Sequence, residues 1–155
     1  MNKTIWGPFI WRFLHLISLR IKDEYFESEK SNLIQYILCI CDNLPCPHCS
    51  SHALVFLDKY KLKFIKTKEH LIKLLYLMHN DVNKSLNKPI IEEEKLYEIY
   101  KPYNFEFFAL NYFKLNKSIH SGEKMMIYSL RRKQFLKDFY EYMKNNIYKF
   151  DIMVE

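Results

Sequence analysis

Two cysteines separated by two residues, Cys46 and Cys49, are the side chains of this chain best suited to chemistry. Thiols at this spacing can close a small, reducible disulfide and exchange it with another thiol. Pro47 follows the first cysteine, which is typical of the first turn of a helix that has Cys46 as its N-cap. The positive end of the helix dipole favours a thiolate there. The spacing therefore predicts dithiol exchange and leaves the electron acceptor open.

The same cysteine spacing also serves haem attachment and zinc binding, so neighbouring residues must discriminate. Haem attachment requires a histidine directly after the second cysteine, and position 50 is Ser. A zinc site needs four ligands, which Cys46, Cys49, His52 and one of Cys39 or Cys41 could supply, but zinc sites normally take two ligand pairs from separate segments. We expect no metal, and a zinc-stabilised helical interaction module is the first alternative.

The dipeptide Pro47-His48 between the two thiols also occurs in thioredoxin-like proteins, which exchange disulfides without a flavin. That fold places its cysteines after a β-strand of a βαβ unit. Here residues 33–41 have apolar positions at helical spacing, and no strand precedes the motif. A flavin-free thiol–disulfide carrier is the second alternative.

The composition fits a single helical domain. The chain has 155 residues, of which 49% are hydrophobic, and only two are glycine, so few residues are available for the tight turns of a many-stranded sheet. All four cysteines lie between positions 39 and 49, unlike the disulfide framework of a secreted protein.

The net charge of +6 is spread among 18 acidic residues, so we expect no nucleic-acid partner. We see no signal peptide and no membrane span, and expect an intracellular protein.

Hydrophobic periodicity predicts the helices that position the cysteine pair. We expect helices over 6–20, over 29–41 with Ser28 as N-cap after a polar connection, over 47–60, over 68–86 with Thr67 as N-cap, and a shorter one over 92–100. Prolines 89 and 102 end the last two. An aromatic segment over 105–113, a polar turn around Ser121-Gly122 and a last helix over 123–149 follow. We expect residues 1–102 to form one unit, with 103–155 as a C-terminal helical extension packed on or beside it.

Further motifs accompany the cysteine pair in a characteristic order. They are Trp6-Gly7-Pro8 with Trp11 and Leu14-His15, then Cys46-Pro47-His48-Cys49 with His52, then His79-Asn80-Asp81-Val82-Asn83 with Leu86 and Lys88-Pro89. In this combination the chain resembles the ERV/ALR family of FAD-linked sulfhydryl oxidases over about residues 6–102, and most of all its poxvirus and other large-DNA-virus members. The resemblance implies an all-α fold, a four-helix bundle with a short fifth helix, which binds FAD at the mouth of the bundle and forms a homodimer.

The resemblance also implies an activity, the FAD-dependent oxidation of thiols that forms disulfides in proteins. Cys46 would receive the substrate thiolate, Cys49 would face the flavin, and the electrons would pass to O2 and give hydrogen peroxide. No cysteine follows Cys49, so the shuttle and structural disulfides of many cellular members are missing. We therefore expect the protein substrate to meet Cys46 directly, as in a relay to a small thioredoxin- or glutaredoxin-like partner. We expect a viral protein that acts in the host cytoplasm or in the virion.

The resemblance further implies which residues bind FAD. Gly7 would let a ligand approach the backbone, the asparagines would pair with adenine and ribose, and Lys88 would neutralise the pyrophosphate. Either Tyr97 or Tyr100 would stack on the adenine. Cys39 and Cys41 point to different faces of one helix, and we expect both to be small core residues, with a role as shuttle cysteines as the alternative. The FAD-binding residues expected are Gly7, Pro8, Trp11, His15, His52, Phe56, His79, Asn80, Val82, Asn83, Leu86, Lys88, Tyr97 and Tyr100.

Overall fold

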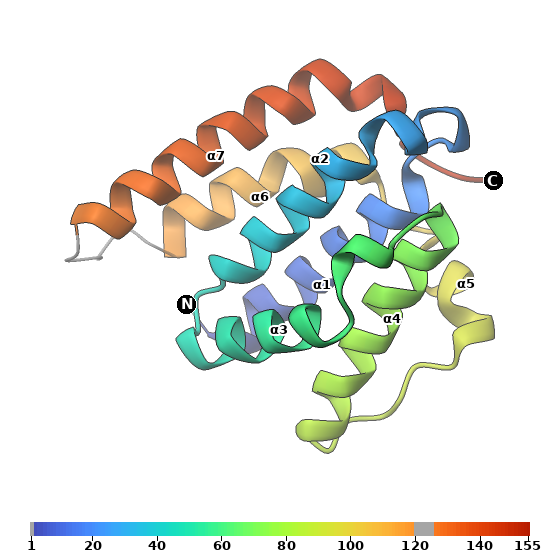
Figure 1. The fold of residues 1–155 in the computed structure, drawn as a ribbon, viewed down its shortest axis with the longest axis horizontal. Helices are drawn as coiled ribbons and strands as arrows, with labels where there is room; N and C mark the ends of the chain where they lie inside the picture. Colours follow the sequence, from blue (N-terminus) through green and yellow to red (C-terminus); the bar gives the residue numbers. More distant parts are fainter. Residues whose placement is uncertain (1, 120–125) are drawn as a thin grey trace.

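The computed structural model describes residues 2–119 and 126–155, and the regular elements in these ranges are all helices (Figure 1). Short 3-10 turns follow three of the helices, at Leu62–Phe64, Glu93–Lys95 and Ile147–Lys149. The all-α fold predicted from the sequence is confirmed. The helices are α1 (Lys3–Arg20), α2 (Asp23–Asp42), α3 (Pro47–Lys59), α4 (Lys68–Ser85), α5 (Leu96–Tyr100), α6 (Phe105–Ile119) and α7 (Met126–Asn146).

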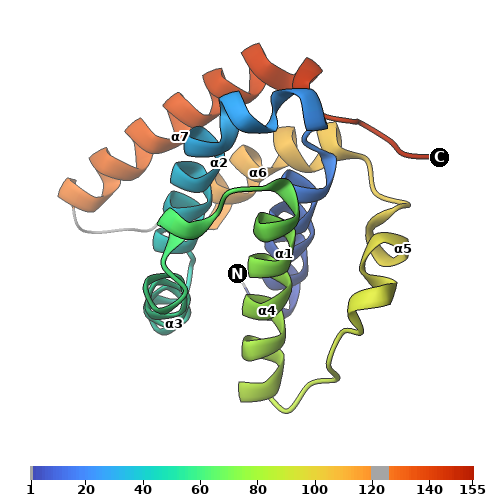
Figure 2. The ribbon, with the colours of Figure 1, turned by 45° about the vertical axis from the view of Figure 1, so that its right-hand side comes forward.

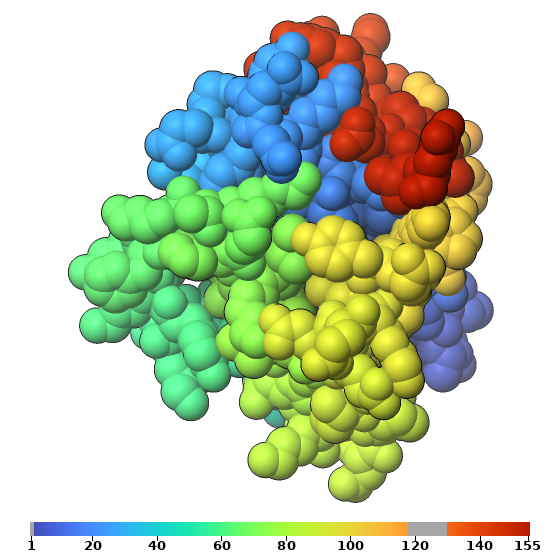
Figure 3. All heavy atoms as spheres, turned by 90° about the vertical axis from the view of Figure 1, so that its right-hand side faces the viewer, coloured from blue at the N-terminus to red at the C-terminus, as the bar shows by residue number. Residues whose placement is uncertain are grey.

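Helix α1 is the central element, because every residue from Phe13 to Arg20 is buried. It packs against α4, α5 and α6, while α3 joins the bundle through α2 and α4. Figures 1 and 2 both show α3 and α5 on opposite sides of α4. The face of the molecule shown in Figure 3 therefore carries α3, α4 and α5 side by side, with the C-terminal residues directly above α5.

The starts of α3 and α4 agree with the sequence prediction. Pro47 opens α3, and Cys46 caps it, since the Cys49 N–H donates to the Cys46 Sγ at 3.2 Å. Thr67 caps α4 by accepting a hydrogen bond from the His70 N–H at 3.1 Å. These ends depend only on local chemistry: a proline in the first turn and a side chain that satisfies a free N–H.

The predicted start of α2 was wrong. The helix begins at Asp23, so the polar connection predicted over 22–30 is helical from its second residue on. Ser28 lies inside the helix, where its Oγ donates to the Tyr25 carbonyl. Phe26 and Glu29 continue the buried side of the helix toward its N-terminus. The exposed residues between them are polar, and this solvated face was mistaken for a loop. Helix α5 is also shorter than predicted, because residues 93–95 form a 3-10 turn.

The C-terminal helices add an aromatic layer to the core. Phe139 of α7 lies 6.0 Å from Phe13 of α1 and 5.8 Å from Tyr112 of α6, measured between ring centroids. The aromatic segment predicted over 105–113 forms the first part of α6 and supplies buried rings such as Phe105, Phe108 and Tyr112, while Phe107 is exposed. Helix α7 falls within the helix predicted over 123–149. Residues 123–125 of that prediction and the Ser121-Gly122 turn lie outside the described residues.

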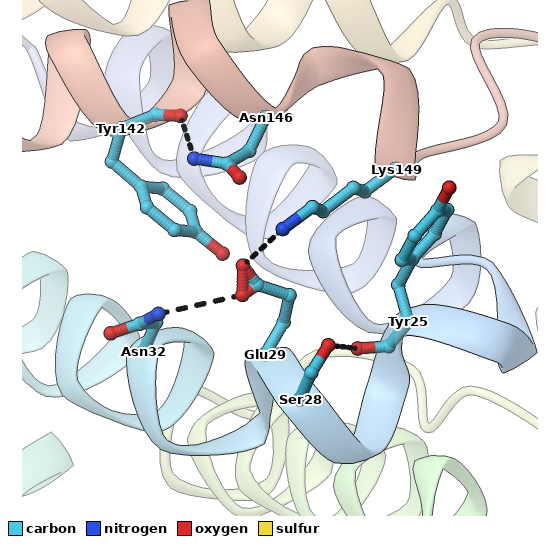
Figure 4. A network of polar contacts seen from close by, with 7 residues as sticks. All are labelled: Tyr25, Ser28, Glu29, Asn32, Tyr142, Asn146 and Lys149. Atoms are coloured by element: carbon cyan, nitrogen blue, oxygen red, sulfur yellow. Dashed lines mark hydrogen bonds and ion pairs between the residues drawn. The ribbon is translucent and has the colours of Figure 1, made fainter.

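A buried ion pair also fastens α2 to the end of the chain (Figure 4). The Glu29 side chain is only 6% exposed, and its carboxylate accepts a hydrogen bond from the Lys149 Nζ at 2.9 Å and one from the Asn32 amide at 3.4 Å. Tyr25 of α2 meets Tyr148 edge to face with ring centroids 5.7 Å apart. The residues that follow α7 are therefore held on the bundle.

Candidate active site

A cavity of about 550 Å³ lies between α1, α3, α4 and the segment around α5, within the size range of small-molecule and cofactor sites. Its wall combines aromatic rings with cationic side chains: Trp6, Trp11, Tyr100 and Tyr103 among the first, Lys3, Arg12 and Lys88 among the second. Such a wall suits a flat ligand that carries negative charge.

The structure brings most of the predicted cofactor residues to this cavity. His15, Phe56, Asn80 and Tyr97 are not part of its wall. Of the two motif cysteines, Cys49 lines the cavity and Cys46 does not. The predicted residues that line it are Gly7, Pro8, Trp11, His52, His79, Val82, Asn83, Leu86, Lys88 and Tyr100.

The two motif cysteines are free thiols in unequal environments. Burial raises the pKa of Cys46, but hydrogen bonds from the Cys49 thiol and backbone N–H, with the positive charge of Lys3, outweigh it, and the pKa of Cys46 lies below its ordinary value. Burial and the neighbouring Cys46 thiol raise the pKa of Cys49. Because the thiolate is the nucleophile, these opposite shifts favour Cys46 over Cys49 as the more reactive sulfur.

A stack of rings forms the cavity wall between α1 and α4. Trp11 lies flat on His79, with ring centroids 4.1 Å apart and an interplanar angle of 5°. Behind His79, the His15 Nε2 lies 2.9 Å from the His79 Nδ1, and the His15 ring stacks on Tyr100 at 4.5 Å. The resemblance placed His15 in the flavin pocket, but the structure buries it completely as the support of His79 and Tyr100.

Both rings of this histidine pair are neutral near pH 7. Burial, followed by the charge of His79, lowers the pKa of His15 well below its ordinary value. Burial and the charge of Lys88 lower the pKa of His79 to about 4. Two neutral rings share one hydrogen bond, in which one nitrogen donates and the other accepts.

Asn80 braces the chain after α4 and does not face the cavity. Its Oδ1 accepts from the Ile91 N–H and its Nδ2 donates to the Ile91 carbonyl, both at 2.9 Å. Asn83 supports the same segment, since its carbonyl accepts from the Lys88 N–H at 2.8 Å. Together these bonds hold Lys88 at the cavity. Both polar ends of the Asn80 side chain are occupied, unlike the ligand contact expected for it.

The structure separates the two candidate tyrosines. Tyr100 is 4% exposed and lines the cavity, whereas Tyr97 is 58% exposed and faces a different hollow beside α5. Phe56, also expected at the cofactor, packs against Tyr60 with centroids 4.4 Å apart.

Sequence reasoning missed several residues of the cavity wall, among them Lys3 and the neighbouring pair Arg12 and Tyr103. The Arg12 guanidinium lies over the Tyr103 ring at 4.9 Å from its centroid. Tyr103 follows the end of the motif-bearing region, but Arg12 could have been found, because it lies one turn after Pro8 on the same side of α1.

His52 connects the cysteine helix to α4, since its Nε2 lies 2.8 Å from the Asp81 Oδ2. Cys41 lies in the core as predicted and also contributes to the cavity wall, and burial raises its pKa to about 12. Cys39 is only partly buried, so the core role predicted for it is not what the structure shows.

Within residues 2–119 and 126–155, no three His, Cys, Asp or Glu side chains gather as metal ligands. The ligand set considered for zinc is therefore not assembled. None of the helices that the structure describes is both long and apolar enough to cross a bilayer.

Comparison with known proteins gives a consistent match. The pattern of the Erv1 / Alr family matches residues 8–101, which contain the cysteine pair and most of the cavity wall. An FAD-linked sulfhydryl oxidase of African swine fever virus (isolate Pig/Kenya/KEN-50/1950) is 38% identical over 96 residues, 62% of this chain and 80% of that protein. The FAD-linked sulfhydryl oxidase ERV2 of Saccharomyces cerevisiae is 27% identical over 96 residues, 61% of this chain and 47% of that protein. The chain belongs to the Erv1/Alr family.

Proposed function

We propose that this chain is an FAD-linked sulfhydryl oxidase that forms disulfides in protein substrates, with Cys46 and Cys49 as its redox pair. One observation carries the proposal: the reactive thiol of Cys46 lies outside a large cavity, while its partner Cys49 lies in the cavity wall. A pair placed in this way can receive electrons from outside and deliver them to a bound cofactor. A flavin-free carrier would have no need of such a cavity.

The cavity residues fit FAD, as Gly7 illustrates. A glycine inside a helix costs about 0.5–1 kcal/mol relative to alanine. No packing within the protein explains it here, because a Cβ added at Gly7 would meet nothing within 4 Å. The open space beside its backbone would admit a flat ring system. Trp11 and Tyr100 would offer ring faces to it, and Arg12 and Lys88 would offer positive charge to a pyrophosphate.

The cysteine environments suit the two thiol exchanges. In the disulfide form, a substrate thiolate attacks the Cys46 sulfur, and the Cys49 sulfur leaves with the electron pair of the broken bond. A second substrate thiolate then displaces Cys46, which leaves readily because its pKa is low. The substrate departs as a disulfide, and the enzyme holds two thiols.

The reduced pair must then be reoxidised from the cavity side. FAD, when bound, accepts the two electrons and transfers them to O2, which gives hydrogen peroxide. Cys49 must lose its proton for this step, and Lys3 promotes the loss because its positive charge and hydrogen bond favour the Cys49 thiolate.

Further points of the proposal concern partners and location. All four cysteines of the chain lie between 39 and 49, so substrate thiols would meet Cys46 directly, and a small thioredoxin- or glutaredoxin-like relay protein would suit this exchange. The family resemblance supports a homodimer. The viral relative supports an origin in a large DNA virus and action in the host cytoplasm. We also propose residues 1–102 as the oxidase domain, in line with the family match.

The test uses the purified full chain loaded with FAD. We expect yellow protein whose flavin absorbance falls when dithiothreitol is added under nitrogen, and which consumes oxygen and forms hydrogen peroxide in air. Cys49→Ser should abolish oxygen consumption and still bind FAD, while Cys39→Ser, a matched thiol outside the cavity wall, should keep full turnover. Colourless protein with stoichiometric zinc, or turnover by Cys49→Ser, would refute the proposal.

A further inference from the structure

Arg20, the last residue of α1, is a buried cation that forms no hydrogen bond or ion pair with a carboxylate within the described residues, although burial lowers its pKa and the negative charge of Asp151 partly offsets that shift. It is 2% exposed, and its guanidinium donates only to backbone carbonyls. A guanidinium remains charged in such a place, and burial is tolerated only when its N–H groups are well satisfied. The carbonyls that it contacts must therefore stay where they are.

These carbonyls belong to two segments far apart in the sequence. On one side, the Arg20 Nη2 donates to Tyr100 at 3.0 Å, to Lys101 at 3.2 Å and to Tyr103 at 2.8 Å. On the other side, the Nη1 donates to Ile152 at 2.8 Å and, more weakly, to Asp151 at 3.4 Å. Arg20 thus joins the turn 100–103 to the C-terminal segment 150–152. Figure 3 shows the C-terminal residues lying directly above α5.

Backbone and ring contacts fix the C-terminal segment from its other sides. The Asp151 N–H donates to the Arg20 carbonyl at 2.7 Å, and the Phe105 N–H donates to the Ile152 carbonyl at 2.9 Å. The Phe150 ring is buried and stacks on Phe105 with centroids 4.4 Å apart. Segment 150–152 therefore holds both the end of α1 and the start of α6, and the turn 100–103 lies between these two fixed points.

The turn 100–103 carries two side chains of the cavity wall. Tyr100 lines the cavity and supports His15, and Tyr103 lines it beneath the Arg12 guanidinium. A displacement of the turn would move both rings and the cation over one of them. The position of this wall consequently depends on residues 150–152, which lie outside the family match over 8–101.

We propose that Arg20 and the C-terminal segment 150–152 are positioning groups of the cofactor cavity, which set the turn 100–103 and so complete the FAD site. Of the two, only segment 150–152 lies outside the family match over 8–101. The proposal rests on the proposed function only for the identity of the ligand.

The test compares two disrupting variants with two controls, all made in the full protein. The disrupting variants are a chain that ends at Lys149 and Arg20→Lys, whose point-like ammonium cannot reproduce the forked donors. The first control ends at Ile152 and keeps both carbonyls. The second, Glu29→Gln, weakens another buried attachment of the extension without touching the turn.

Two quantities are measured well below the melting temperature. One is the dissociation constant of FAD, by titration of the apoprotein, and the other is the hydrogen exchange of the backbone amides of residues 100–104 without FAD. Both disrupting variants should raise the dissociation constant by about tenfold or more, because charged hydrogen bonds are lost, and should exchange faster. At saturating FAD, turnover per flavin should stay unchanged. Both controls should remain within about twofold of the full chain in both measurements.

Each other outcome decides against the proposal. Unchanged FAD affinity in the chain that ends at Lys149 would overturn it, as would an equal loss in Glu29→Gln, which would reduce the extension to general stabilisation. If the full chain binds no FAD, the proposed function fails. The exchange measurement still tests whether Arg20 and segment 150–152 position the turn 100–103. Unchanged exchange over 100–104 in both disrupting variants would overturn that positioning role.

Discussion

Lowering the pH from about 7.5 to about 4.5 should cost the folded protein about 2.5 kcal/mol of stability through His79 alone. Burial and then the charge of Lys88 lower the pKa of His79 from 6.5 to about 4. The unfolded chain therefore takes up a proton on this ring at higher pH than the folded chain does. The stabilisation is complete above pH 6.5 and is lost as the pH falls toward the folded value of about 4.

The assay is urea unfolding at a series of pH values, followed by tryptophan fluorescence, for the wild type and for His79→Gln. Glutamine can still hydrogen-bond the His15 Nε2 and does not titrate. The variant loses the stack on Trp11 and should be less stable at neutral pH. Its further loss on acidification should nevertheless be smaller than that of the wild type by about 2.5 kcal/mol.

The comparison removes the titration of His79, and with it the His79 charge that adds to burial in lowering the pKa of His15, while the remaining titrating groups are present in both proteins. His70→Gln replaces an exposed histidine near the start of α4 and serves as the control for the loss of a histidine elsewhere in the protein. An equal acid-induced loss in the wild type and in His79→Gln would refute the reasoning, because the buried ring would then not be the group that resists protonation.

Three further predictions concern the cavity and its supports. Gly7→Ala should stabilise the apoprotein by about 0.5–1 kcal/mol in urea unfolding, because the new Cβ meets nothing within 4 Å. Gly7→Leu should weaken FAD binding, and unchanged FAD affinity in this variant would contradict the fit of FAD beside Gly7. Lys3→Met should raise the pKa of Cys46, because the Lys3 charge lowers it; the pH dependence of alkylation by iodoacetamide measures this, and an unmoved midpoint would count against it. Asn80→Ala should destabilise the protein by about 1–3 kcal/mol, since both backbone groups of Ile91 lose their partner. Thermal unfolding measures this, and an unfolding temperature equal to that of the wild type would show that water replaces the amide.

Local chemistry was sufficient to predict where several elements begin. The proline after Cys46 and the hydroxyl of Thr67 satisfy or remove free N–H groups at a helix start, and such signals act over one turn. The start of α2 could not be predicted in this way. Its cap residue, Lys22, makes no side-chain capping bond, and the position of the helix is set by the burial of Phe26 and Glu29 against later parts of the chain.

The sequence by itself determined the helical fold and the family and predicted the redox role of the cysteine pair, because these depend on residue types, periodicity and spacing along the chain. Only the tertiary structure decided which residues meet. It placed His79 in the cavity wall with His15 against it, put Tyr100 but not Tyr97 in that wall, and turned Asn80 toward the Ile91 backbone.

The physical reason is that helical spacing identifies a shared face but not the partner that covers it. Arg20 shows this most clearly: its sequence position at the end of a helix is typical of a cation that faces water and the helix dipole. Its guanidinium instead binds carbonyls about 80 and 130 residues further along the chain, and that pairing exists only once α1, the turn 100–103 and the C-terminal segment have packed together.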